Sequence, residues 1–227
     1  MYQERPSTLP GAVVWSGSDN RPGSVQRVLP DGCMDLLWAE GGLLVAGPDT
    51  SAHLATVPAG TGYVGLRFAP GAGPAVLGVP ASALRDLRVP LQDVWPLALV
   101  RRLVGLIDGA ADAADRGAAL ERIAQARDGP DPLVARIVAC VRAGRGIASI
   151  AGEVDLSARQ LHRRCLAAFG YGAKTLARIL RMNRAVAAAH TGVPFATVAA
   201  VCGYADQAHL ARDVKDLAGV PLGSLIR

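Results

Sequence analysis

One sequence pattern occurs twice in the carboxy-terminal part of the chain, and it limits the possible folds more than any other feature. The two copies span residues 151–165 and 199–214. When Leu161 is aligned with Leu210, a residue type that caps helices lies four positions before each leucine, and an arginine lies two positions after it. Each copy therefore predicts a short helix, a tight turn and a second helix that begins after an N-cap residue.

The N-cap residues are Ser157 in the first copy and Asp206 in the second. Such a unit is a helix-turn-helix, whose second helix can enter the major groove of DNA. An apolar row follows one side of each second helix, and Arg163 and Arg212 project from the other side. The rows consist of Leu161, Cys165 and Phe169 in the first copy, and Leu210, Val214 and Leu217 in the second.

A long helix is predicted between the copies, over residues 173–190. At 1.5 Å per residue it spans about 27 Å, so it could hold two recognition helices about one DNA turn, or about 34 Å, apart. Arg178 and Arg181 recur at a spacing of three along this helix. Two interpretations of these arginines stay open: contacts with DNA phosphates, or salt bridges to a neighbouring motif.

Positive charge is concentrated in the same part of the chain. Residues 131–227 contain 13 Lys and Arg against 6 Asp and Glu, whereas residues 1–130 contain 11 against 13. A domain that faces DNA phosphates carries such an excess. A basic surface that serves solubility alone would give the same numbers, so charge supports DNA binding without proving it.

The amino-terminal part predicts a different architecture. Short β-type runs alternate with Gly- and Pro-rich turns, which is typical of a small barrel or sandwich. The predicted strands are 12–15, 25–28, 34–38, 43–46, 53–57 and 63–68. The predicted turns lie at 30–32, 40–42, 47–49, 58–60 and 70–71. Helices are expected over 81–87, 97–107 and 115–126, before a turn at 128–132. We thus expect an α+β chain with two domains, at 1–128 and 131–227, the second of them all-α.

A catalytic or ligand site in the amino-terminal part is only weakly indicated. Asp31, Cys33, Asp35 and Glu40 could line a pocket, but ordinary strand and turn residues around a buried thiol are favoured. Arg67 lies in an alternating run and is expected to face water, although it could instead bind an anion in a barrel mouth. A single histidine before residue 162 leaves no metal-binding cluster, so we expect no catalytic residue, cofactor or metal.

The four cysteines, Cys33, Cys140, Cys165 and Cys202, lack the spacing of zinc ligands. Two of them occupy apolar helical positions, which fits reduced thiols in the cytoplasm. The start of the sequence does not resemble a signal peptide, and no apolar run reaches the roughly 18 residues that span a bilayer. We therefore expect a soluble cytoplasmic protein with no membrane partner.

Three motifs in residues 131–227 together resemble the AraC/XylS family of bacterial transcription activators. These motifs are Leu156-Ser157-x-Arg159-x-Leu161-x-Arg163, Leu180-Arg181-x-x-Arg184-Ala185, and Val198-Ala199-x-x-x-Gly203-Tyr204-x-Asp206-x-x-His209-Leu210-x-Arg212-x-x-Lys215. The resemblance implies two helix-turn-helix motifs on a linker helix that read adjacent major grooves of double-stranded DNA. It also implies RNA polymerase as a partner, and a cupin-like amino-terminal domain that senses a small effector or forms a homodimer.

Carried over position by position, the resemblance implies base contacts from both second helices. Those residues are Arg159, His162 and Arg163 in the first motif, and Gln207, Ala208, Ala211 and Arg212 in the second. His209 could contact phosphate or pack within the turn. Ala208 and Ala211 cannot donate hydrogen bonds from their side chains, so the second motif could contact thymine methyl groups or mainly the DNA backbone.

Two other functions are considered beside a transcription regulator. The amino-terminal domain could be a cupin-type metalloenzyme fused to a DNA-binding tail, but the two-His-plus-carboxylate set of such a site is missing from the sequence. Alternatively, the chain could be a protein-interaction adaptor that has lost DNA binding, which the retained arginines argue against. The sequence indicates a non-enzymatic regulator, and it does not identify the effector, the operator or the direction of regulation.

Overall fold

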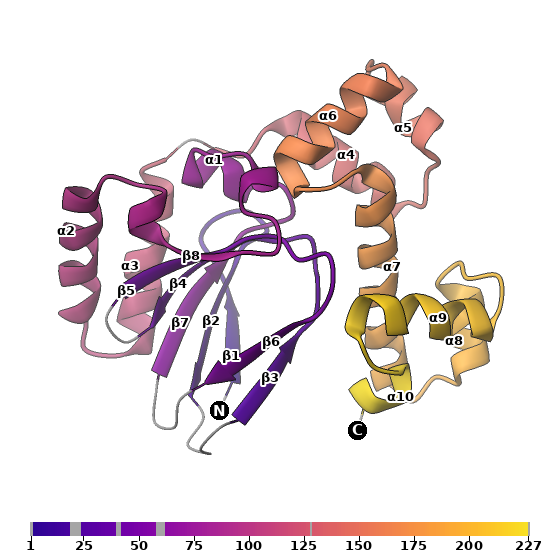
Figure 1. Ribbon diagram of the computed structural model, residues 1–227, viewed down its shortest axis with the longest axis horizontal. Coiled ribbons are helices and arrows are strands. Elements are labelled where there is room, and N and C mark those ends of the chain that lie inside the picture. Colours follow the sequence, from indigo (N-terminus) through magenta and orange to yellow (C-terminus); the bar gives the residue numbers. More distant parts are fainter. Residues whose placement is uncertain (1, 19–23, 40–41, 58–61, 128, 227) are drawn as a thin grey trace.

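The computed structural model describes residues 2–18, 24–39, 42–57, 62–127 and 129–226 (Figure 1). Strands dominate the amino-terminal part, and helices make up the carboxy-terminal part. The described residues form two hydrophobic cores, one between Ala12 and Ala124 and the other between Val134 and Leu222. This arrangement confirms the predicted α+β fold, with a β-rich region followed by a helical one.

A six-stranded antiparallel sheet forms the centre of the amino-terminal part. Its strands lie in the order β1-β2-β7-β4-β5-β8, and β3 pairs with β6 in a separate two-stranded ribbon. The strands are β1 (Tyr2–Pro6), β2 (Val13–Ser18), β3 (Ser24–Val28), β4 (Asp35–Ala39), β5 (Gly42–Ala46), β6 (His53–Val57), β7 (Gly62–Arg67) and β8 (Arg88–Pro90). The six predicted strands are confirmed within one to three residues at each end. The edge strands β1 and β8 were not predicted.

The two faces of this sheet have different roles, because successive residues of a strand point to opposite sides. On one face, Val14 and Leu66 are buried beneath helix α3 (Ala113–Gln125), where Gly117 lies so close to Val14 that a Cβ would not fit. On the other face lie Trp15 of β2 and Arg67 of β7. The first face belongs to the hydrophobic core, and the second is free to form a site.

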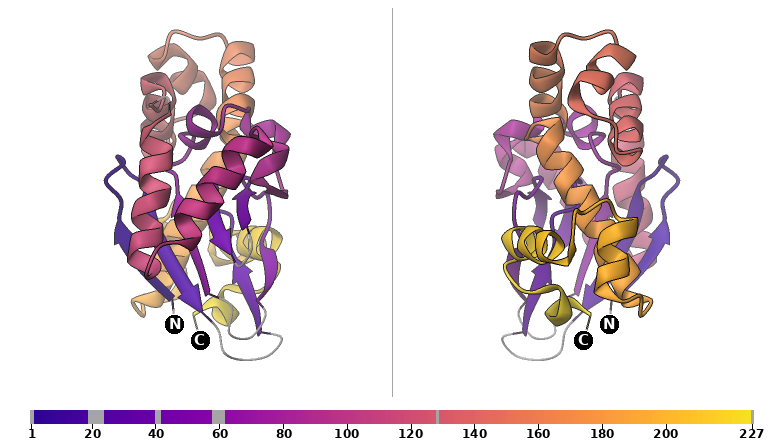
Figure 2. Two further views of the ribbon diagram at one scale, coloured as in Figure 1. Left: turned by 90° about the vertical axis from the view of Figure 1, so that its left-hand side faces the viewer. Right: turned by 90° about the vertical axis from the view of Figure 1, so that its right-hand side faces the viewer.

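Short helices connect the strands to the flank of the sheet. These elements are α1 (Gly73–Leu77), the 3-10 turns η1 (Ala81–Ala83) and η2 (Leu91–Asp93), and α2 (Leu97–Asp108). Helices α2 and α3 are confirmed to within two residues and lie side by side on one flank (Figure 2). The predicted helix over 81–87 is wrong beyond Ala83. Asp86 there has a φ of 59°, and its carboxylate accepts hydrogen bonds from Thr50, so a helix cannot continue.

The carboxy-terminal part contains the helices that the repeated pattern predicts. They are α4 (Pro132–Arg142), α5 (Ile147–Glu153), α6 (Ala158–Phe169), α7 (Ala173–His190), α8 (Phe195–Val201), α9 (Gln207–Ala218) and α10 (Leu222–Leu225). The predicted spans of α6, α7 and α9 are confirmed. The predicted turns at 40–42 and 58–60 and the boundary residue Asp128 fall wholly or partly outside the described residues.

Local chemistry explains where α6 and α9 begin and end. The Ser157 hydroxyl accepts from the Gln160 amide while the Gln160 side chain accepts from the Ser157 amide, which makes a full capping box. The Asp206 carboxylate accepts from the His209 amide at the start of α9. Gly170 and Gly219 end the two helices with φ values of 80° and 72°, in the left-handed region that favours glycine.

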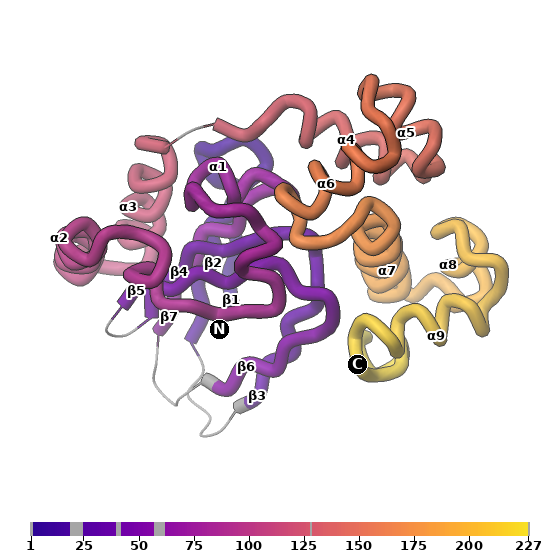
Figure 3. Tube along the Cα trace, turned by 45° about the horizontal axis from the view of Figure 1, so that its top comes forward, coloured from indigo at the N-terminus to yellow at the C-terminus, as the bar shows by residue number. Residues whose placement is uncertain are grey.

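Helix α7 runs between the two motifs and beside the amino-terminal part (Figures 1 and 3). Near one end of α7, α6 contacts η1 and α1. Helices α8 and α9 pack against α7 farther along. The β3–β6 ribbon stands apart from the main sheet on the side nearest α9 (Figure 3). The strand region therefore contacts both helix-turn-helix motifs and helix α7 between them.

Candidate nucleic-acid interface and amino-terminal cavity

Helix α6 presents the predicted basic residues to solvent. Arg159, His162 and Arg163 are exposed, whereas Leu161 and Cys165 on the other side are at most 1% exposed. No carboxylate pairs with Arg159 or Arg163 in the part of the chain that the structure describes. His162 lies against Gly172, just before α7 begins. The two arginines are thus free to donate to an external acceptor.

Helix α9 exposes a less charged surface. Gln207, Ala208, Ala211 and Arg212 are exposed along the side opposite the buried row. His209 lies within the turn, because its ring meets Tyr204 edge-on at 5.1 Å and its Nδ1 accepts from the Ala205 amide at 3.3 Å. Of the two interpretations of His209, packing in the turn is the one that the geometry supports.

The linker arginines are held inside the domain. Arg178 Nη2 lies 2.7 Å from Asp213 Oδ1, and Arg181 Nη2 lies 3.1 Å from Asp213 Oδ2. Asp213 belongs to α9 and is only 5% exposed. The Arg181 guanidinium also stacks 4.3 Å above the ring of Tyr204. These arginines therefore connect α7 to the second motif, which was the second of the two interpretations of their spacing.

Sequence reasoning did not assign a role to Asp213 or Tyr204. Burial, with the nearby Asp213 carboxylate, raises the pKa of Tyr204 to about 12. A signal for Asp213 was present, since it follows the buried Leu210 by three positions and precedes the buried Val214 by one. An acid on the apolar side of a helix predicts a buried partner of opposite charge.

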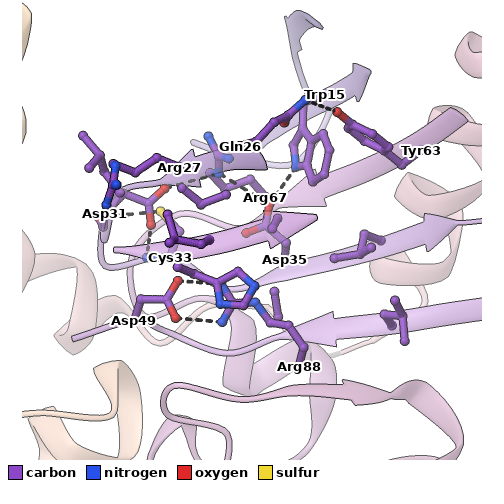
Figure 4. Close-up of a pocket in the computed structure, with 18 of the residues that line it drawn as sticks. Trp15, Gln26, Arg27, Asp31, Cys33, Asp35, Asp49, Tyr63, Arg67 and Arg88 are labelled. Carbon is purple, nitrogen blue, oxygen red and sulfur yellow. Dashed lines mark hydrogen bonds and ion pairs between the residues drawn. The ribbon is translucent and has the colours of Figure 1, made fainter. Parts of the chain in front are cut away.

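A cavity of about 680 Å³ lies between the main sheet and the β3–β6 ribbon (Figure 4). Its lining includes Trp15, Asp31, Cys33, Asp35 and Arg67 from the amino-terminal part. Asn183 of α7 also lines it, and its Nδ2 donates to the Pro30 carbonyl at 3.0 Å. The linker helix of the helical region is thus part of the cavity wall.

Arg67 is central to one end of this cavity, and the expectation that it faces water is wrong. Its Nε lies 3.2 Å from Asp31 Oδ2 and 3.4 Å from Asp35 Oδ1, and its Nη1 lies 3.4 Å from Glu4 Oε1. The rule for lone charges fails because three carboxylates approach one guanidinium: Glu4 of β1, Asp35 of β4, and Asp31 in the segment before β4. Asp31, Cys33 and Asp35 do line a pocket, whereas Glu40 lies outside the described residues.

Burial shapes the protonation of this end of the cavity. It raises the pKa of Asp35 to about 6, although Arg67 opposes the shift. It also raises the pKa of the Cys33 thiol, with Asp31 and Asp35 adding to the effect, so the thiol stays protonated and unreactive. Elsewhere in the wall, Arg88 is matched by Asp49 through two hydrogen bonds of 2.7 and 2.6 Å.

Direct contacts connect the strand region to the ends of both recognition helices. Arg27 Nη1 donates to the Ala218 carbonyl at 2.8 Å, and the Ala52 amide donates to the Leu217 carbonyl at 2.7 Å. At the first motif, Arg85 Nη1 donates to the Gly170 carbonyl at 3.2 Å. The last carbonyls of a helix lack internal partners, and cations there interact favourably with the helix dipole.

Comparisons with known proteins find similarities to two parts of the chain. The family described as "Helix-turn-helix domain" matches residues 150–227, and a "Domain of unknown function (DUF6597)" matches residues 12–90. No curated protein matches the chain. Among solved structures, a probable AraC family transcriptional regulator from Rhodopseudomonas palustris aligns over 42% of this chain and 95% of its own, with 19% identity and a TM-score of 0.38.

Apo ToxT from Vibrio cholerae aligns over nearly the whole length of both chains. The alignment covers 99% of this chain and 98% of ToxT, with 13% identity and a TM-score of 0.51. ToxT bound to a methylnaphthalenyl-butenoic acid covers 99% of each chain, with 12% identity and a TM-score of 0.50. The carboxy-terminal region is an AraC-type helix-turn-helix domain. The protein is a DNA-binding transcription regulator with this domain behind a β-rich region.

Two further observations concern the chain that carries the AraC-type domain. Within the described ranges, no group of three or more His, Cys, Asp and Glu side chains could hold a metal ion. None of the described helices has both the length and the apolar character needed to cross a membrane.

Proposed function

We propose that α6 and α9 of the AraC-type domain read successive major grooves of one DNA duplex. We assign base contacts in the first groove to Arg159, His162 and Arg163. Arginine is the commonest reader of guanine, and Arg159 and Arg163 are exposed without a described carboxylate partner. In the second groove the contacts come from Gln207, Ala208, Ala211 and Arg212, and we assign the contact of Arg212 to the DNA backbone. Ser157, Asp206 and His209 support these helices at their start, and Arg178 and Arg181 position α9.

We further propose that a small effector in the cavity controls the second motif. In support, ToxT shares the overall fold and binds a small organic acid in one of its structures. The observation that carries the proposal is the position of Arg27. It lines the cavity with its neighbours Gln26 and Val28 on β3, and its Nη1 donates to the Ala218 carbonyl at the end of α9.

The ribbon is suited to passing a signal in this way. Gln26 Nε2 donates to the Tyr63 hydroxyl at 2.8 Å, which connects the ribbon to the main sheet across the cavity. An isolated two-stranded ribbon is marginally stable, so small changes in its contacts can displace it. A ligand that displaces Gln26 would therefore move Arg27 and Ala52 relative to the carbonyls of Leu217 and Ala218. These bonds restrain α9 in the structure.

The test is Arg27→Met, which keeps an apolar stem and removes the bond to Ala218. Loss of the restraint is expected to tighten DNA binding by about 3- to 10-fold, the range for one such hydrogen bond. The measurement is fluorescence anisotropy with a site selected from random DNA. The control is Arg122→Met on the exposed side of α3, for which no change is expected. Unchanged or weaker binding by Arg27→Met would refute the restraint.

Other partners belong to the same proposal. We infer that the regulator acts in the cytoplasm without catalysing a reaction, and that it contacts RNA polymerase as the family resemblance implies. We also infer a homodimer through α2, where Leu106 is 67% exposed. Light scattering of the chain and of Leu106→Lys tests the dimer, since the charge should give monomers. We also propose that the chain divides into two domains, at residues 1–128 and 131–227.

A further inference from the structure

The floor of the cavity is aromatic because of two glycines in the sheet. In the β2–β7 pairing, Trp15 lies opposite Gly65 and Tyr63 lies opposite Gly17. Each ring covers its glycine so closely that a Cβ at Gly65 or Gly17 would collide with it. The two rings meet at 5.6 Å with an angle of 64° between their planes. The sequence thus provides space for two aromatic rings, tilted against each other, on the side of the sheet that faces the ribbon.

A surplus of negative charge lies beside this floor. Trp15 Nε1 donates to Asp35 Oδ1 at 2.7 Å, so the indole and the carboxylate are in direct contact. Asp31 and Glu4 also approach Arg67, which gives three carboxylates around one guanidinium. With a pKa of about 6, Asp35 is mostly ionised at neutral pH. The cluster then has two more negative than positive charges.

The other described arginines of the lining do not offset this surplus. Arg88 is neutralised by Asp49 through its paired hydrogen bonds. Arg27 is turned toward the carbonyl of Ala218, at the end of α9. An anionic ligand would therefore have to compete for Arg67 with Asp31 and Asp35, and for Arg88 with Asp49. A cation would instead meet unbalanced carboxylates and the faces of aromatic rings, which attract positive charge.

We propose that the cavity binds a small organic amine, with its ammonium group at Asp31 and Asp35 and its apolar body stacked on Trp15 and Tyr63. This assignment rests on the effector-sensing function proposed above and specifies the chemical class of the effector. Carboxylates supply charge-assisted hydrogen bonds to the head, and the rings add cation–π and stacking contacts. The apolar part of the lining, including Leu37, Leu44 and Leu54, accommodates the rest of the molecule.

Three probes with the same phenyl body and different heads test the proposal. They are phenethylamine, phenethyl alcohol and hydrocinnamate, titrated by calorimetry into the whole chain without DNA near neutral pH. We expect the amine to bind about tenfold more tightly than the alcohol, and the acid to bind most weakly. Equal or tighter binding of the acid would overturn the proposal, as would the absence of binding by all three at millimolar concentration.

Variants locate the preference within the cavity. Asp35→Asn and Asp31→Asn keep the size of each side chain and an oxygen acceptor for the Trp15 indole or the Cys33 amide. Each should reduce the preference for the amine over the alcohol to about threefold or less. Asp93→Asn, an exposed acid in η2, should leave it unchanged. A preference that survives in both cavity variants would place the amine elsewhere. Thermal melting confirms that each variant is folded.

The outcome can be separated from that of the proposed regulation. Calorimetry without DNA measures only the preference for the head group, whereas the Arg27→Met experiment measures only the restraint on α9. If the amine is not preferred but Arg27→Met tightens DNA binding, the ligand class alone is wrong. If the amine is preferred and Arg27→Met has no effect, the class is right and the coupling is wrong.

Discussion

The two helix-turn-helix motifs share a sequence pattern, yet they are held in different ways. Helix α6 is stabilised by its own apolar row and by the capping box at Ser157. Helix α9 has an equivalent row, but it also contains the buried Asp213, which binds two arginines of α7. The end of α9 accepts hydrogen bonds from Arg27 and Ala52 of the strand region, while the Gly170 carbonyl at the end of α6 accepts one from Arg85.

This difference suggests to us that the two copies of the motif have different roles in DNA binding. The exposed arginines of α6 are suited to sequence reading, because no described carboxylate competes for them. The surface of α9 is poorer in donors, and its position is controlled by the linker helix and by the cavity wall. Repetition of a pattern therefore conserves the fold of the unit, whereas the residues between the repeated positions decide which copy is restrained.

The largest effect that would test this comparison is expected from Asp213→Ala. The change leaves Arg178 and Arg181 without their buried partner. Since both arginines keep contact with solvent, we expect a loss of about 2 kcal/mol of unfolding free energy, less than for a fully buried pair. Chemical denaturation measures it. Asp216→Ala, at a side chain that is 69% exposed, should cost no more than about 0.5 kcal/mol. Equal effects would mean that the buried pairing of Asp213 with Arg178 and Arg181 does not anchor α9.

An effect of similar or smaller size is expected on DNA binding. Arg163→Ala should weaken binding by about 1–3 kcal/mol and relax the base preference at one position, since a base contact is lost. Arg212→Ala should weaken binding evenly across sequences and reduce the salt slope by about one, as expected for a phosphate contact. Selection from random DNA, repeated with each variant, distinguishes the two patterns. Relaxed preference in the Arg212 variant alone would reverse the proposed roles.

The smallest expected effect concerns the N-caps. Ser157→Ala and Asp206→Ala should each lower the unfolding free energy by about 1 kcal/mol, because each leaves an amide at the helix start unbonded. Their local consequences should differ, since Asp213 still holds α9. Hydrogen exchange should therefore accelerate more in α6 of the first variant than in α9 of the second. The reverse ranking would show that the cap, and not the buried acid, secures the second motif.

The helical part could be predicted closely because its determinants are local. Caps, left-handed glycines and apolar rows lie within a few residues of the boundaries they set, so α6, α7 and α9 follow from the sequence. The strand β1 escaped notice because Tyr2–Pro6 is an exposed edge strand without apolar alternation. The surroundings of Arg67 could not be derived, since they depend on Glu4 in that same strand and on Asp31 and Asp35, more than thirty residues before it.

The placement of Asn183 restricts how regulators built on this plan can diversify. The Asn183 side chain extends from α7, the helix between α6 and α9, and it also lines the cavity that we propose for the effector. A substitution on α7 that adapts the cavity wall to a new ligand can therefore also change the spacing between α6 and α9. We therefore expect ligand specificity and DNA-sequence specificity to change together, and Asn183 is a position at which both can be tested.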